Sequence, residues 1–189
     1  MKANRLENII IMALEAEAPE MATWDNVFFT GVGKVNAAVT TATLLERYPD
    51  CKHVFNFGTV GGITPGLEGL NYIGNFVQRD MQCSPMGVQE GMTPFEQYIT
   101  ICFQYDALTC STGDNFVTDP NLTLKADVVD MEAYAIAKAI ITADRDIKFH
   151  CYKYVSDNAN ESSSDDWRAN VANGQPYYIE QYKRLNPDG

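Results

Sequence analysis

The sequence has no long hydrophobic run. Nowhere does the chain of 189 residues approach the roughly 20 consecutive apolar residues of a membrane-spanning helix. The segment Met1–Asn8 contains no apolar core followed by a cleavage site, as a secretion signal would. With 46% hydrophobic and 21% charged residues, the composition predicts one globular domain over residues 1–189 with a sizeable core. We therefore expect no membrane partner and a cytoplasmic location.

Cysteine pairs, histidine and positive charge are also scarce. The five cysteines are odd in number and show no CxxC spacing, which favours free thiols over disulfides or zinc sites. His53 and His150 lie in strand-like runs without a metal-ligating neighbour, so the sequence predicts structural roles for them and no metal site. The net charge of −11 argues against nucleic-acid binding, because phosphate backbones repel such a surface. It does not argue against a small, buried nucleoside.

Short apolar runs alternate with helical stretches, which is typical of an α/β domain with a largely parallel sheet. The sequence has no internal repeat and no low-complexity linker. Residues 80–96 form the longest irregular stretch and are a candidate binding loop. The expected strands cover 9–14, 27–30, 53–57, 72–77, 108–111 and 149–155, and the expected helices cover 35–48, 131–143 and a last helix from about 165 to 185 that is interrupted at 174–176.

Three acids lie at the edges of the predicted core. Glu17 closes the first apolar run, Asp157 follows the last strand, and Glu132 shares a predicted helix face with Ala135 and Ile136. An acid there costs free energy unless it is paired, and proteins tend to keep such acids for ligands or chemistry. Because ligands bind at the carboxyl ends of strands in such sheets, we expect these acids to converge. Taken alone, Asp157 equally fits a turn or cap, and Glu17 an acidic first helical turn.

Two glycine-rich segments follow predicted strands. Gly58–Gly62 lets the backbone approach a ligand, although a plain tight turn fits the pattern as well. Gly31–Lys34 matches neither the Walker pattern nor the full dinucleotide-binding fingerprint, so tight-turn packing is the better interpretation.

Six segments follow one another along the chain in a recognisable order: Ile10–Glu17, Gly31–Ala38, Phe57–Gly62, Thr112–Val117, Val129–Ala133 and Val155–Asp157. Together they resemble the nucleoside phosphorylase/nucleosidase superfamily, and within it the 5′-methylthioadenosine/S-adenosylhomocysteine nucleosidases. The resemblance covers most of the chain and implies a three-layer α/β/α fold, a homodimer, a purine nucleoside as the small-molecule partner, and no cofactor.

The resemblance also implies residue roles. Glu17 matches the carboxylate that activates water, Asp157 the general acid that protonates purine N7, and Glu132 the acid that binds the ribose hydroxyls. Such chemistry passes through an oxocarbenium-like ribosyl cation, as glycoside hydrolysis does. The remaining matches are Met131 beside the sugar, Ser156 beside Asp157, Phe116 and Val117 at the base, Thr59 and Gly61 near the water or phosphate site, and Cys83 and Met86 at the 5′ substituent.

The chain departs from the family pattern at three places. Lys153 stands where the family has arginine, and the resemblance implies that it is a substrate-binding residue. Asp130 stands where glutamate is usual. Residues 95–108 leave little room for the usual helix and strand, so the fold is expected to be somewhat truncated. Lys153 keeps the charge but loses the bidentate fork of arginine. The shortened stretch falls near the expected substrate pocket and dimer contact.

Three functions therefore stay open. The leading hypothesis is a hydrolase that releases adenine from a 5′-modified adenosine. A phosphorylase is the alternative enzyme, but a phosphate pocket favours arginines, and Arg79 is the only one between Arg47 and Arg145. The third hypothesis is a non-catalytic nucleoside-binding relative; the shortened stretch favours it, whereas the retained acids argue against it.

Overall fold

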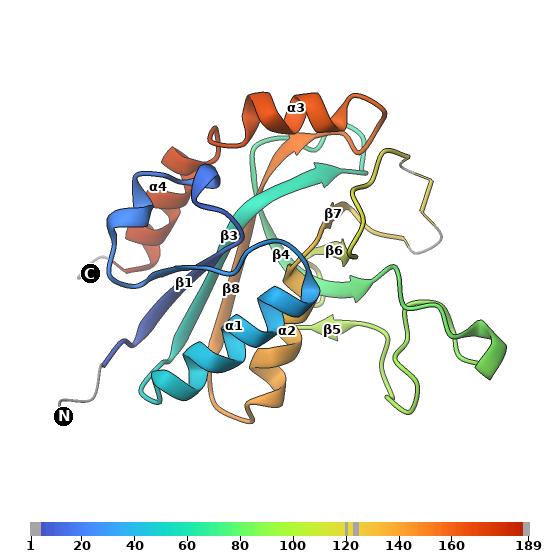
Figure 1. Cartoon of the computed structure of the whole chain (residues 1–189), viewed down its shortest axis with the longest axis horizontal. Helices are drawn as coiled ribbons and strands as arrows, with labels where there is room; N and C mark the ends of the chain where they lie inside the picture. Colours follow the sequence, from blue (N-terminus) through green and yellow to red (C-terminus); the bar gives the residue numbers. More distant parts are fainter. Residues whose placement is uncertain (1–4, 120, 123–124, 187–189) are drawn as a thin grey trace.

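The computed structural model describes residues 5–119, 121–122 and 125–186, and within them eight strands form one mixed sheet flanked by helices (Figure 1). No helix in these ranges combines the length and hydropathy of a membrane span. The strands are β1 (Asn8–Met12), β2 (Val27–Phe29), β3 (His53–Gly62), β4 (Leu70–Gln78), β5 (Ile101–Cys102), β6 (Leu108–Thr112), β7 (Val128–Asp130) and β8 (Lys148–Asp157). The α-helices are α1 (Lys34–Arg47), α2 (Ala133–Thr142), α3 (Ser163–Asn170) and α4 (Gln175–Leu185).

The sheet closes on itself around its middle strands. Its order is β2-β1-β3-β7-β6-β4-β5, and β8 pairs with both β3 and β4. The strands β3, β8, β4, β6 and β7 thus form a ring in which each strand pairs with the next. Most of the pairs are parallel, but β3 with β7, β4 with β8 and β4 with β5 are antiparallel. The mixed, largely parallel sheet expected from the sequence is confirmed.

The alternation of side chains along β1 separates two cores. Ile9 and Ile11 belong to the cluster that includes residues of α1 and α2, whereas Ile10 and Met12 pack with Tyr178 of α4. Successive side chains of a strand point to opposite faces of the sheet, so a continuous apolar run is buried on both sides. Helices therefore cover both faces, which confirms the three-layer arrangement.

The helices begin and end where the sequence signals predict. α1 starts directly after Gly33, whose φ of 98° lies in the left-handed region that favours glycine, and it ends at Arg47, two residues before Pro49. Pro176 lies in the first turn of α4, where its missing N–H would have no helical partner. The interruption expected at 174–176 is thus the boundary between two helices.

Two expectations about local structure were wrong. Gly58–Gly62 is the second half of β3 and not a loop, because its backbone pairs with β8 over this length. The helix expected from Met131 begins only at Ala133, after the unexpected short strand β7. Glu132 is consequently the N-cap residue of α2 and does not lie on its apolar stripe.

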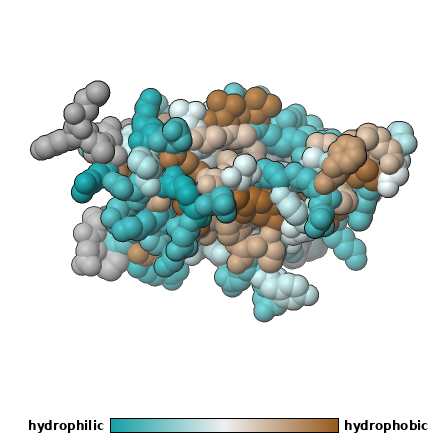
Figure 2. Space-filling view, turned by 90° about the horizontal axis from the view of Figure 1, so that it is seen from below, coloured by the Kyte–Doolittle hydropathy of each residue, from teal (hydrophilic) through white to brown (hydrophobic). Residues whose placement is uncertain are grey.

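The segment after β4 extends away from the sheet (Figure 1). Its regular structure is limited to a single 3-10 turn at Ser84–Met86 and the two-residue strand β5, so the shortened region expected around 95–108 carries no helix. Phe95 and Tyr105 in this segment are 96% and 89% exposed. Seen from below, hydrophobic side chains gather in the middle of the molecule and again at its right-hand end, with hydrophilic ones on the left and between them (Figure 2).

Candidate active site

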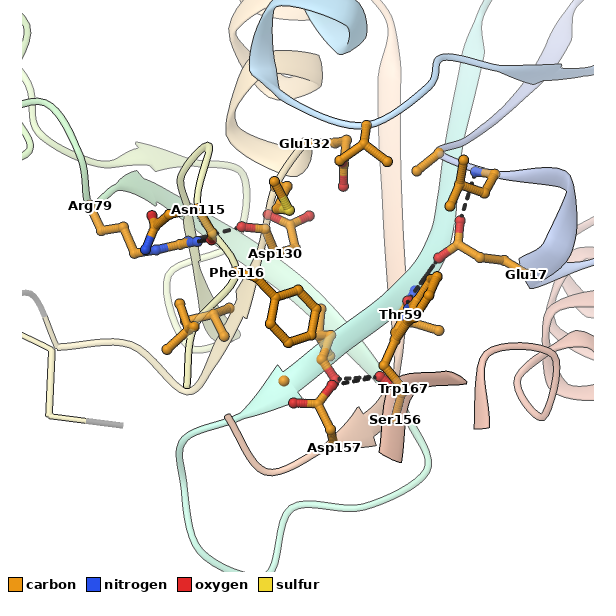
Figure 3. Close-up of a pocket in the computed structure, with 18 residues that line it drawn as sticks. Glu17, Thr59, Arg79, Asn115, Phe116, Asp130, Glu132, Ser156, Asp157 and Trp167 are labelled. Atoms are coloured by element: carbon orange, nitrogen blue, oxygen red, sulfur yellow. Dashed lines mark hydrogen bonds between the residues drawn. The ribbon is translucent and has the colours of Figure 1, made fainter. Parts of the chain in front are cut away.

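One pocket gathers the acids that the sequence singled out (Figure 3). They arrive from strands that run in two directions, since β7 is antiparallel to β3, and not from one edge of a parallel sheet as the sequence predicted. Convergence results because the sheet curls into a ring, which places Val129 opposite Gly61. The lining includes Glu17, Thr59, Gly61, Arg79, Asn115, Phe116, Val117, Asp130, Met131, Glu132, Ser156, Asp157 and Trp167.

Asp157 is aimed into the pocket by an irregularity of β8. The register of β8 against β3 shifts between Val60 and Gly61, which leaves Ser156 as an extra residue. Such a bulge re-aims side chains, and here both Ser156 and Asp157 line the pocket. The Ser156 hydroxyl donates to Asp157 Oδ2 at 2.9 Å, and the Ala159 N–H donates to Oδ1 at 3.0 Å. Asp157, 8% exposed, is therefore held in one orientation.

Glu17 faces the same pocket from a 3-10 turn (Glu15–Glu17) after β1. Its side chain is almost fully buried, and its Oε1 accepts hydrogen bonds from the N–H and the hydroxyl of Thr59 at 2.7 and 2.9 Å. Its Oε2 accepts the N–H of Leu14 at 3.1 Å. Three donors thus satisfy a buried carboxylate that has no ion-pair partner within 4.0 Å in the described chain.

Glu132 lies at the junction of β7 and α2. Its Oε1 accepts the N–H of Gly33 at 2.9 Å, which ties the start of α1 to the pocket. Burial, followed by the nearby Asp130 carboxylate, raises the pKa of Glu132 to about 7. A carboxyl that is 8% exposed and titrates near neutral pH is a candidate functional group.

Glu132→Gln is expected to stabilise the protein at alkaline pH. The folded pKa of about 7 lies above the ordinary 4.5, so the stability that protonated Glu132 contributes is present below pH 4.5 and lost as the pH rises through 7. The variant should therefore gain about 2–3 kcal/mol relative to wild type between pH 5 and pH 8.5. Urea unfolding at both pH values measures this gain, and an equal difference at the two pH values would contradict it.

Asp130 and Lys153 form a buried ion pair behind the pocket wall. Lys153 Nζ lies 3.2 Å from Asp130 Oδ2, and the two side chains are 3% and 1% exposed. Oδ2 also accepts the N–H of Ala133, which caps α2, and Oδ1 accepts the Thr112 hydroxyl at 2.6 Å. Burial opposes ionisation of Asp130, but the Lys153 cation and these hydrogen bonds lower its pKa. Asp130 and Lys153, the two single-residue departures from the family pattern, thus form an ion pair with each other.

Arg79 organises the loop that carries Phe116. Its guanidinium donates to four backbone carbonyls, those of Ser111, Gly113, Asn115 and Asp130. These bonds use both hydrogens on each terminal nitrogen, and Nε has no partner. Burial lowers the pKa of this arginine. Arg79 therefore fixes the wall of the pocket through the backbone, and its terminal N–H groups are not free to bind a ligand.

Nine of the residues proposed from the sequence line this pocket, and three do not. Lys153 is buried behind Asp130. Cys83 and Met86 lie at the 3-10 turn of the extended segment, where Met86 is 61% exposed, and neither lines the pocket. The candidate binding loop at 80–96 is thus not part of this site. Sequence reasoning missed Trp167, which contributes to the pocket from α3. The sequence carries no signal of its direction, because the direction depends on where α3 begins.

The histidines lie elsewhere. His53 Nδ1 and His150 Nε2 are 3.0 Å apart on paired strands, and both rings stack with Phe55, which supports the structural roles expected for them. Burial, followed by the His53 charge, lowers the pKa of His150 to about 4. No group of three or more histidine, cysteine or acidic side chains is placed to hold a metal within the described ranges. All five cysteines are free.

Solved structures of low sequence identity share this fold. The Helicobacter pylori 5′-methylthioadenosine/S-adenosylhomocysteine nucleosidase in complex with a substituted pyrrolidin-3-ol superposes with a TM-score of 0.78 at 18% identity, covering 90% of this chain and 94% of that one. A structure described as futalosine hydrolase from the same species superposes with a TM-score of 0.77 at 18% identity, covering 88% of this chain and 91% of that one.

Sequence comparisons find relatives of higher identity than these solved structures. Proteins named 5′-methylthioadenosine/S-adenosylhomocysteine nucleosidase from Geobacillus thermodenitrificans and Tolumonas auensis are 28% and 31% identical to this chain. The alignments cover 84% and 71% of this chain and 77% and 70% of those relatives. The family model of the phosphorylase superfamily matches residues 26–177, which include all but one of the acids of the pocket. The chain belongs to the phosphorylase superfamily.

Proposed function

We propose that this protein is an N-glycosyl hydrolase that releases adenine from a 5′-modified adenosine of the methylthioadenosine or S-adenosylhomocysteine type. The observation that carries the proposal is the placement of Glu17, Glu132 and Asp157 around one pocket whose wall includes the aromatic Phe116. The names of the relatives from Geobacillus thermodenitrificans and Tolumonas auensis support the same substrate class.

Each acid has a distinct task in the proposed reaction. Asp157 gives a proton to N7 of the purine as the C1′–N9 bond breaks, so that adenine leaves as a neutral base. A water molecule attacks C1′ and loses a proton to Glu17. Glu132 accepts hydrogen bonds from the ribose hydroxyls and favours the positive charge that develops on the sugar. Phe116 and Val117 hold the base, Met131 packs against the sugar, and Ser156 orients Asp157.

Phosphorolysis is the less favoured alternative. A bound phosphate needs cationic donors that are free to reach it. The terminal N–H groups of Arg79 all donate to backbone carbonyls, and the ammonium group of Lys153 is paired with Asp130. Glu17 lines the same pocket, and its carboxylate would repel a phosphate. These contacts favour water as the nucleophile.

Base release from methylthioadenosine, S-adenosylhomocysteine, adenosine and inosine, each with and without phosphate, tests the proposal. We expect free adenine and free sugar without phosphate, fastest with a 5′-thio substrate. Strict dependence on phosphate with a ribose-1-phosphate product would make the protein a phosphorylase. Binding of adenine without release of base from any substrate would leave only the nucleoside-binding alternative.

We also propose that the protein acts as a homodimer in the cytoplasm, in the salvage of methionine from methylthioadenosine. Free thiols on all five cysteines suit a reducing compartment. Exposed Phe95, Tyr105 and Met86 on the extended segment provide apolar surface for a second subunit. Light scattering that gives the mass of one chain at micromolar concentration would rule out the dimer.

A further inference from the structure

One side of the helix α3 faces the strands β3 and β8. Ser163, Trp167 and Asn170 are spaced by four and three residues, so they share a side of the helix. Ser163 is completely buried, whereas Asp165 and Arg168 on another side pair in solvent with side chains that are 84% and 71% exposed. The helix α3 therefore has a buried side and an exposed side, and two of the three residues named on its buried side are polar.

Trp167 connects this face to Glu17 through one hydroxyl group. The indole Nε1–H donates to Thr59 Oγ1 at 3.1 Å, and the same oxygen donates its proton to Glu17 Oε1 at 2.9 Å. An indole N–H only donates, and a threonine hydroxyl has one proton. Trp167 therefore occupies an acceptor position of Thr59 and leaves the hydroxyl proton directed at Glu17. Consecutive bonds of this kind strengthen one another.

Asn170 connects the same face to the other acid. Its Nδ2 donates to the carbonyl of Ser156 at 2.9 Å, directly before Asp157. Between Asp157 and α3 the chain passes through Ala159, which is fully buried and has a φ of 49°. Such a conformation costs a non-glycine residue free energy and persists only where its surroundings hold it. Here Asp157 accepts the Ala159 N–H on one side, and Ser163 accepts the Asn160 N–H on the other.

We infer that α3 is a positioning element for both acids of the proposed reaction, with Trp167 acting on Glu17 through Thr59 and Asn170 acting on Asp157 through the backbone of Ser156. The inference rests on the proposed function. Trp167 is a positioning residue in addition to lining the pocket: its ring is part of the pocket wall, and its N–H acts through Thr59 on the carboxylate that is proposed to activate water. Phenylalanine could supply only the first of these roles.

Trp167→Phe separates the two roles, because it keeps an aromatic ring in the wall and removes the N–H. We expect kcat to fall about five- to tenfold, the rate equivalent of one net hydrogen bond, while KM changes less than about twofold. Asn170→Ala should also lower kcat more than it raises KM. Arg168→Ala, on the exposed side of the same helix, is the matched control and should leave both constants unchanged.

A double-mutant cycle with Thr59→Val tests the route of the effect. Valine keeps the shape of threonine without its hydroxyl, so the bond from Trp167 has no acceptor in that background. Trp167→Phe should then cost nothing further in kcat, because residues that act as a unit are not additive. The inference would be overturned if the fold losses in kcat of the two single variants multiplied in the double variant. It would also be overturned if Trp167→Phe changed only KM.

The four proteins of this cycle are the wild type, Trp167→Phe, Thr59→Val and the double variant. They distinguish failure of the inference from failure of the proposed function. If the wild type releases no base from any nucleoside, the proposed function fails. The coupling between positions 59 and 167 can then be read from free energies of unfolding, which do not depend on activity. Coupling there would support the contact from α3 to Glu17, and additive free energies would overturn it.

Discussion

Asp157→Asn is expected to lower kcat for adenine release by about 10²–10⁴-fold, the usual contribution of a general acid. Asparagine keeps the size of the side chain and can still accept the Ala159 N–H, so the fold and the binding of substrate should persist. The amide cannot give a proton to N7. Steady-state kinetics with methylthioadenosine measures the loss, and KM should change only a few-fold.

Asp146→Asn is the matched control for this variant. Asp146 is an exposed acid shortly before the opposite end of β8, so the same chemical change there should not affect kcat. A second check is adenine binding by Asp157→Asn, followed by the fluorescence of Trp167 in the pocket wall. Full activity of Asp157→Asn would exclude Asp157 as the general acid. Another group would then have to protonate the leaving base.

Lys153→Met is expected to destabilise the protein by about 3–5 kcal/mol, because it leaves the carboxylate of Asp130 buried without its cation. Both side chains are almost entirely buried, at 3% and 1% exposed, so water cannot take over the role of the ammonium group. Urea unfolding at pH 7 measures the loss. A cost below about 1 kcal/mol, the value of an exposed ion pair, would contradict the buried geometry.

The double variant Asp130→Asn/Lys153→Met should recover a large part of this stability. It removes both charges together, and a buried pair that is replaced by neutral groups often costs little. Asparagine at position 130 can still accept the N–H of Ala133 and keep the cap of α2. Additive destabilisation in the double variant would show that the two side chains do not act as a pair.

The sequence predicted that Glu17, Glu132 and Asp157 converge, and all three line one pocket, whereas their surroundings could not be predicted. Asp157 and Glu17 follow apolar runs, and such runs identify strand ends by composition alone. The pairing of Asp130 with Lys153 depends on the strand order, because β7 and β8 do not pair with each other but both pair with β3. No local pattern carries that information, so two separate departures from the family pattern could not be linked.

The errors have equally specific causes. Gly58–Gly62 looked like a loop because glycine is rare in strands, yet Gly61 is needed in β3: a Cβ atom there would lie 3.0 Å from Asp157 Oδ1. Cys83 and Met86 were placed by resemblance in a segment without regular structure, where neither periodicity nor spacing constrains an alignment. Trp167 was recognised only as a helix residue, since its direction depends on where α3 begins.

The ring of strands also determines when the pocket can form during folding. β3 lies in the first third of the chain, but its partner β8 pairs Thr59 with Tyr154, so the two are separated by 95 residues (154 − 59). Contacts between such distant segments slow folding, because a long loop must close before they form. During synthesis the ribosome must deliver the chain through Asp157 before β3 can pair fully with β8. The nascent protein therefore carries Glu17 and Thr59 without the strand that completes their site until β8 has been made.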